Sequence, residues 1–304
     1  MPPRYTIVFE PEQDVYTTGC VLRGRVCLDL AEKINTKGIF IHITCKSVAR
    51  WTRQKTIYFS KQRYLDKVIV LLAPENKVKQ LSIGKYEFPF QVELDERLPS
   101  TFITPSFSFL TPGGRVFYTA KCIIQRSWSS DIVFKREFRV LRHFDLNKLT
   151  AGRQPVQMSD ETNVCCLCCM SGPIHVDFTV DKQLYVPGEG IRVSAEVVND
   201  SNMKTSSCSV NLIQETTLHG KDGASYTMSE IVASLVKPGV AAHKTGSWSD
   251  VLTVPPLTPS FLQGCLIIDL KHTLELHMSG IRKVMVVVIG SIPLSSTGQQ
   301  EAGQ

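Results

Sequence analysis

The sequence predicts an all-β protein built from two tandem antiparallel β-sandwiches with little helix. Apolar residues recur at every second position in many short segments, which is the period of a half-buried strand. No segment shows a sustained period of 3.6 residues with helix caps. The stretch 174–200 also repeats a pattern found near the N-terminus. Because 304 residues exceed the size at which a single core keeps growing, two domains are expected.

The internal repeat aligns when residues 174–200 are shifted back by 169 positions. Tyr185 then pairs with Tyr16 and Gly188 with Gly19, and the flanking apolar positions also match. Farther along, LPSTF ending at Phe102 matches LTPSF ending at Phe261 at a shift of 159. Each copy predicts a strand, a tight turn at the glycine and a second strand. Matched segments in one order, separated by loops of unequal length, indicate two domains of one fold.

In the first half, residues 5–30 predict two strands around the Gly19 turn. The segment 38–51, GIFIHITCKSVARW, alternates apolar and polar residues and predicts a half-buried antiparallel strand. Its apolar face consists of Ile39, Ile41, Ile43 and Cys45. The segment 85–94, KYEFPFQVEL, predicts an edge strand, because Pro89 donates no ladder hydrogen bond. Two more strands are expected at 116–128 and 132–141.

A polar and basic segment spans residues 50–67, where aromatic residues separate the charges. We expect a loop with short strand pieces here, with a helix at 61–67 as an alternative. Guanidinium and ammonium groups among aromatic rings can hold phosphates or acidic side chains by charge-assisted hydrogen bonds. A solvated polar loop is the other interpretation. The candidate residues for an acidic or phosphorylated partner are Arg50, Arg53, Lys55, Lys61, Arg63 and Lys67.

The predicted domains are residues 1–146 and 163–294, joined by a linker at 147–162, and residues 295–304 form a short polar tail. The linker lacks any period and mixes polar residues with Gly and Pro. Within the second domain, strands are expected after the repeated pair at 208–219, 229–236, 250–257, 266–278 and 282–294.

Charge is distributed unevenly along the chain. Residues 1–150 hold 24 Lys and Arg against 14 Asp and Glu, a net of +10, whereas the remainder holds 10 against 14, a net of −4. Such a bias favours acidic or phosphorylated partners, or an anionic membrane surface, over nucleic acid. The absence of a secretory signal and of a long apolar run predicts a cytosolic protein. Its ten cysteines are then expected to be reduced thiols.

Four cysteines cluster at Cys165, Cys166, Cys168 and Cys169. Zinc sites use separated pairs that converge from a turn, whereas alternate residues of an extended segment point to opposite sides. We therefore expect strand thiols, with S-acylation near a membrane as an alternative and metal binding as a weaker one. Motifs of metalloproteases, serine hydrolases and nucleotide-binding loops are missing. The sequence thus predicts neither enzymatic activity nor a cofactor.

One P-P-x-Y motif occurs at Pro2, Pro3 and Tyr5. A proline pair in polyproline II followed by tyrosine can lie in the aromatic groove of a WW domain. Tyr5 also opens the first predicted strand, and pairing in a sheet would hide the motif.

Several segments together resemble the alpha-arrestins, the arrestin-domain-containing proteins. They are YTTGCVLRGRV from Tyr16, GKYEFPFQVEL followed by LPSTF, FDLN from Phe144, CCLCCMSGPI from Cys165, YVPGE from Tyr185 and VVIGSIPL ending at Leu294. The resemblance covers nearly the whole chain. It implies the arrestin fold, which is two immunoglobulin-like β-sandwiches in tandem.

The resemblance further implies a non-enzymatic adaptor that binds cytoplasmic tails of membrane receptors or transporters as cargo. Such adaptors recruit WW-domain HECT ubiquitin ligases through a C-terminal P-P-x-Y tail and act in endocytosis, endosomal sorting and protein transport. This sequence shows no such tail after Leu294, so a short form is expected. The expected location is the cytoplasm, with recruitment to the plasma membrane and endosomes and peripheral membrane contact. A structural arrestin-fold subunit of an endosomal sorting or coat complex is the alternative.

Overall fold

The computed structural model describes residues 4–73, 78–105, 107–108, 111–166, 169–221 and 223–295. Within them the protein is 66% strand, and its helices are two three-residue 3-10 helices, η1 (Leu146–Lys148) and η2 (Ser260–Leu262), which confirms the predicted fold class. No helix in these ranges is long and apolar enough to cross a membrane. The chain forms two compact units. Unit 1 comprises Met1–Arg142, Leu218–Tyr226 and Leu262–Asp269, and unit 2 comprises His143–Thr217, Thr227–Phe261 and Leu270–Gln304.

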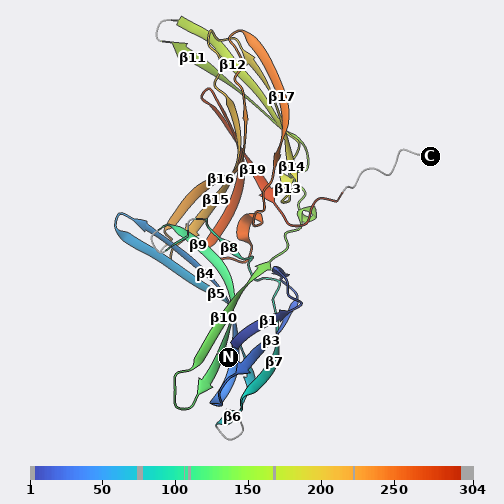
Figure 1. Cartoon of the computed structure of the whole chain (residues 1–304). Helices are drawn as coiled ribbons and strands as arrows, with labels where there is room; N and C mark the ends of the chain where they lie inside the picture. Colours follow the sequence, from blue (N-terminus) through green and yellow to red (C-terminus); the bar gives the residue numbers. More distant parts are fainter. Residues whose placement is uncertain are drawn as a thin grey trace, which may run out of the picture. The chain divides into compact units, whose positions relative to one another are not determined.

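Unit 1 is a sandwich of a three-stranded and a seven-stranded sheet (Figure 1). The smaller sheet has the order β1 (Arg4–Glu10), β3 (Val21–Leu30) and β7 (Gly84–Glu93), so β7 is an edge strand as predicted. The larger sheet has the order β2 (Val15–Thr17), β10 (Ile132–Leu141), β9 (Gly113–Arg126), β4 (Ile34–Arg53) and β5 (Thr56–Leu72). In addition, β6 (Lys79–Leu81) pairs with β4, and β8 (Phe102–Ile103) pairs with β9.

The core of unit 1 lies between these sheets. The predicted apolar face of β4, Ile39 to Cys45, is completely buried, as is the alternating face of β9 from Tyr118 to Ile124. The ring of Phe9 in β1 packs edge-on against Tyr16 and Phe138, at centroid distances of 5.6 and 5.1 Å. Apolar side chains at every second position therefore face inward from both sheets, as the sequence pattern requires.

The strand pieces expected within residues 50–67 belong to β4 and β5, but the loop and the helix predicted there are wrong, because the two strands form one long antiparallel hairpin. A two-residue turn at Gln54 and Lys55 connects the strands, and both residues have positive φ, 47° and 68°. Turns of this type match the twist of the flanking strands. The sequence did not indicate the hairpin, because the turn lacks Asn-Gly and one face of β5 is solvent-exposed along its length.

The N-terminal residues form three strands rather than the predicted two. After pairing with β3, the chain crosses to the other sheet, where β2 runs parallel to β10. Gly19 follows with φ of +79° and starts the return to β3. In unit 2, β13 (Leu184–Tyr185) likewise runs parallel to β19 (Ile281–Ile289), and Gly188 follows with φ of +87°. The two copies of the repeat therefore make the same crossover.

Unit 2 also contains two sheets (Figure 1). One has the order β11 (Val156–Cys166), β12 (Cys169–Val180), β14 (Gly190–Asn199) and β17 (Lys244–Thr253). The other has the order β13, β19, β18 (Ile268–Met278), β15 (Cys208–His219) and β16 (Ser225–Lys237). A buried cluster that includes Phe178, Tyr185 and Leu274 forms its core.

Residues 156–162 of the predicted linker belong to strand β11, so the structure differs from the prediction there. Their polar side chains gave no apolar period, because β11 is the edge strand of its sheet and pairs only with β12 among the described residues. The remaining domain boundaries stay a prediction.

Equivalent side-chain hydrogen bonds occur within each unit at positions that the sequence repeat matches. Thr101 Oγ1 accepts the amide of Val140 at 2.9 Å, and Ser260 Oγ accepts the amide of Ile289 at the same distance. These are the matched hydroxyls of LPSTF and LTPSF. The buried Tyr16 and Tyr185 donate their hydroxyls to backbone carbonyls a few residues upstream, at 3.0 and 2.7 Å. The sequence repeat thus reflects equivalent local structure.

Candidate functional site: a basic sheet face in unit 1

The outer face of the seven-stranded sheet gathers basic side chains from three neighbouring strands. Strand register places Lys46 of β4 between Arg63 of β5 and Phe117 of β9. One row farther, Val48 lies between Lys61 and Arg115. Side chains in such rows are neighbours on one face of a sheet. We define the basic face as Lys46, Arg50, Lys61, Arg63, Arg115 and Lys121.

The structure brings together half of the basic residues selected from the sequence. Arg50, Lys61 and Arg63 lie on the basic face. Arg53 follows the buried Trp51 by two residues, so alternation directs it to the opposite face. Lys67 pairs with the buried Ile43 and is on that opposite face too, and Lys55 lies in the turn.

Sequence reasoning missed Lys46, Arg115 and Lys121. Lys46 could have been found, because it alternates with the predicted apolar face of residues 38–51. The two β9 residues could not, because only the pairing of β9 with β4 brings them close.

Electrostatic effects at Lys46 reflect the concentration of positive charge. Its pKa is lowered, first by partial burial and then by the nearby Arg63, Lys61 and Lys121. Asp66 offsets part of this charge, since it accepts hydrogen bonds from His42 and Arg63. Those two contacts hold the pKa of the Asp66 carboxyl below its ordinary value. An anion beside Lys46 would gain from the positive groups on both neighbouring strands.

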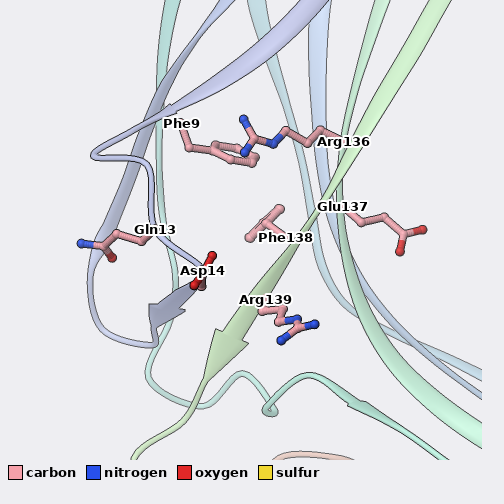
Figure 2. A pocket seen from close by; sticks show the side chains of 7 residues that line it. All are labelled: Phe9, Gln13, Asp14, Arg136, Glu137, Phe138 and Arg139. Carbon is pink, nitrogen blue, oxygen red and sulfur yellow. The ribbon is translucent and has the colours of Figure 1, made fainter. Parts of the chain in front are cut away.

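A cavity of about 470 Å³ is lined by residues of β1, β10 and the segment leading to β2. Figure 2 shows the Arg136 guanidinium beside the ring of Phe9, with Arg139 on another wall. Arg136 lies 4.9 Å from that ring centroid and donates to the Ile7 carbonyl at 3.0 Å and to Glu12 Oε1 at 2.6 Å. These contacts hold its guanidinium in place within the unit.

A second cavity, of about 220 Å³, is lined by β8, β9 and β10 and shares Glu137, Phe138 and Arg139 with the first. Arg115 of the basic face also lines it, with its guanidinium 4.1 Å from the ring centroid of Phe117. The basic face therefore reaches a cavity that combines aromatic rings with guanidinium groups.

The remaining candidate residues lie partly outside the described residues. Pro2 and Pro3 are outside them, whereas Tyr5 is half-buried in β1, opposite Leu28, and its ring stacks on Phe134 at 5.7 Å. Burial raises the pKa of Tyr5. By its backbone, Tyr5 is thus a strand residue, as the competing interpretation of the motif expected.

The cysteine cluster lies largely outside the described residues. The backbones of Cys165 and Cys166 are in β11 and that of Cys169 is in β12, but Cys168 and all four side chains lie outside the described residues. Strand thiols, S-acylation and metal binding therefore stay predictions. Among the described side chains, no three His, Cys, Asp or Glu are arranged to hold a metal ion.

Comparison with known proteins identifies related chains along nearly the full length. Residues 5–147 match the family model for the arrestin (or S-antigen) N-terminal domain, and residues 170–294 match the model for the arrestin C-terminal domain. Human arrestin domain-containing protein 4 is 28% identical over 97% of this chain and 73% of its own length. Arrestin domain-containing protein 17 of Caenorhabditis elegans is 27% identical over 95% of this chain and 71% of its own length.

Each of the two matched segments contains one copy of the crossover described above. Proteins of this family generally act as non-enzymatic adaptors that bind partner proteins. The chain belongs to the arrestin family and is related to the arrestin-domain-containing proteins.

Proposed function

We propose that this protein is a non-enzymatic adaptor that binds acidic or phosphorylated cytoplasmic segments of receptors or transporters through its basic face. The observation that carries the proposal is the meeting of Lys46, Lys61 and Arg63 on adjacent strands. Carboxylates and phosphates bind such groups by charge-assisted hydrogen bonds, which are shorter and stronger than those between neutral groups. Family membership supports the adaptor role in general terms.

Cargo bound in this way would be directed to endocytosis and endosomal sorting, with the adaptor moving from the cytoplasm to the plasma membrane and endosomes. The Pro2 to Tyr5 motif adds no support for ligase recruitment, because Tyr5 pairs within the first sheet. A WW domain could bind it only after the start of β1 had separated from β3.

The test compares two charge-reversal variants, one with its substitutions on the basic face and one with its substitutions off that face, by their affinity for a peptide. A variant with Lys46→Glu, Lys61→Glu and Arg63→Glu should weaken binding of a fluorescent phosphoserine peptide rich in Glu by about tenfold or more. The matched control changes Arg53, Lys55 and Lys67 to Glu, which introduces the same charge on the same hairpin but off the face. Fluorescence anisotropy gives both affinities.

Equal weakening in the two variants would mean that the peptide senses only net charge, and no weakening would reject the face as the site. Vesicles containing phosphatidylserine provide the comparison with a membrane surface. If the face variant loses vesicle binding but retains peptide binding, the face contacts lipid and the proposal is rejected. In cells, a fluorescent fusion of the face variant should fail to move to the membrane with an activated receptor.

A further inference from the structure

We propose that the acidic partner segment binds as an added β-strand along the free edge of β5, at residues 56–63. This inference rests on the proposed function and specifies the form of the partner. Strand β5 ends the order of the seven-stranded sheet and pairs with β4 along one side. Among the described residues, no strand pairs with its other side. Backbone groups along such an edge can hydrogen-bond with an extended peptide.

The side chains of β5 define what the added strand would carry. Ile57, Phe59, Lys61 and Arg63 share the outer face, and Ile57 and Phe59 are 59% and 52% exposed. An added strand presents every second side chain to this same face. Apolar residues opposite Ile57 and Phe59, followed by acidic or phosphorylated residues opposite Lys61 and Arg63, would complement it. Antiparallel pairing is slightly more stable per residue than parallel pairing. The partner is therefore an antiparallel extended segment that carries, from its N-terminus, two anionic and then two apolar side chains at alternate positions.

Strand β4 adds a further positive charge that can attract the anionic side chains of the added strand. Lys46 of β4 lies next to Arg63, in the same row and one strand farther from the edge. Long anionic side chains, phosphoserine above all, can reach diagonal and second-row neighbours.

The proposed strand ends at residue 63 for a structural reason. The register of β4 and β5 shifts between Cys45 and Lys46, which leaves Tyr64 as an additional residue on β5. Such a bulge interrupts the ladder and bends the strand. Beyond it, Asp66 lies on the outer face and would repel an anionic segment. The binding edge is thus limited to residues 56–63.

A competing explanation is that Lys61 and Arg63 only protect the edge. Charged side chains on edge strands prevent unwanted pairing with other chains. Edge protection predicts that no strand adds there, whatever its charge. The exposed apolar pair at Ile57 and Phe59 argues against pure protection, because exposed apolar residues on an open edge promote association rather than prevent it.

The experiment uses the full chain and a fluorescein-labelled peptide of about eight residues, Glu-Thr-Glu-Thr-Val-Thr-Val-Thr, a typical strand length. Two analogues carry N-methyl groups on alternate amides, one on the odd and one on the even positions. Because only every second amide of an added strand faces its neighbour, one analogue should lose about tenfold or more in affinity and the other should bind like the parent. Hydrogen exchange should slow at amides within residues 56–63 on peptide addition.

The controls separate this inference from the proposed function. The double variant Lys61→Glu, Arg63→Glu should no longer bind the parent peptide. The control variant Arg53→Glu, Lys67→Glu should bind it with unchanged affinity. If both analogues bind like the parent and the β5 amides remain unprotected while the charge variant still loses binding, strand addition is overturned and the proposed function stands. If neither variant changes binding of this peptide or of the phosphoserine peptide, both proposals are overturned.

Discussion

At the scale of single residues, burial separates side chains that look alike in the sequence. Trp51 is 1% exposed and Trp128 is 94% exposed, although each follows a basic residue by one or two positions in a strand-forming segment. The alternation of β4 placed Trp51 inside. Its stacking on Tyr226 could not be predicted, because that residue lies far away in the chain.

Trp51→Ala should destabilise unit 1 by about 3–5 kcal/mol, because it removes a fully buried indole and leaves a cavity. The indole stacks on Tyr58 at 5.1 Å and on Tyr226 at 6.3 Å. Trp128→Ala removes the same side chain from the surface and should change stability by less than about 0.5 kcal/mol. Urea unfolding followed by circular dichroism compares the two midpoints. Equal midpoints would contradict the packing described for Trp51.

His272 should make the stability of unit 2 depend on pH. It is fully buried and hydrogen-bonded to Ser260 at 2.8 Å and to Gln214 at 3.3 Å, and burial lowers its pKa from 6.5 to about 4. The unfolded chain therefore binds a proton that the folded chain excludes. Stability present above pH 6.5 should be lost as the pH falls toward about 4, by about 3 kcal/mol at about 1.4 kcal/mol per pKa unit.

The measurement is the unfolding midpoint of unit 2 at a series of pH values between 7 and 4. His272→Gln should flatten that dependence, whatever its effect on stability at neutral pH. The exposed His143, replaced by Gln, is the control and should leave the slope unchanged. An unaltered slope in His272→Gln would assign the pH dependence to other groups.

At the scale of elements, the sequence predicted which segments are strands better than how they pair. Residues 38–51 and 85–94 alternate over a buried face, so periodicity identified them and even the edge position of β7. Residues 50–67 were predicted as a loop with short strand pieces, since the inward face of residues 56–63 carries the small or polar Ser60 and Gln62 beside Tyr58. Only half of the basic residues selected from the sequence lie on the basic face. Its residues come from three strands whose adjacency is a tertiary property.

The β4–β5 turn gives a prediction for a single element. Gln54 and Lys55 both have positive φ, a conformation in which side chains are strained and which Asn and Gly accept more readily. The double variant Gln54→Asn, Lys55→Gly should therefore stabilise unit 1 by about 1 kcal/mol. Thermal unfolding measures the change. Asn and Gly introduced instead at Lys61 and Gln62, within β5, should destabilise unit 1. If this control variant unfolded at a higher temperature than the turn variant, the assigned turn would be contradicted.

At the scale of the whole molecule, charge and connectivity are the properties that matter. The net charge of +10 in residues 1–150 against −4 in the remainder corresponds to the location of the basic face in unit 1. Affinity for the phosphoserine peptide should fall steadily as salt increases from about 50 to 300 mM, because counterions screen exposed charges. The face variant should show a shallower salt dependence than the off-face control. Parallel slopes would mean that the face is not the contact.

Unit 1 is not one continuous segment of the chain, and it differs from the segment matched by the family model. The arrestin N-terminal match ends at residue 147, yet unit 1 also includes Leu218–Tyr226 and Leu262–Asp269. Tyr64 accepts the amide of Leu266 at 3.0 Å, and Leu218 and Ile268 lie so close to Gly114 that a side chain there would collide with them. These segments complete the inner side of the β4–β5 hairpin.

A fragment of residues 1–147 should therefore be less stable than unit 1 in the full chain. It lacks Tyr226 over Trp51 and the Leu266 amide that donates to the Tyr64 hydroxyl. Apolar surface is then exposed and one hydrogen bond is lost, although the Tyr64 hydroxyl keeps Ser47 as a partner. With Trp128 and Trp248 replaced by Phe in the full chain, Trp51 fluorescence reports unit 1 alone. The urea midpoint should be lower in the fragment carrying the same Trp128 replacement, and the fragment should bind a hydrophobic dye that the full chain does not. Equal midpoints would show that residues 1–147 fold as an independent domain, as the sequence repeat alone would suggest.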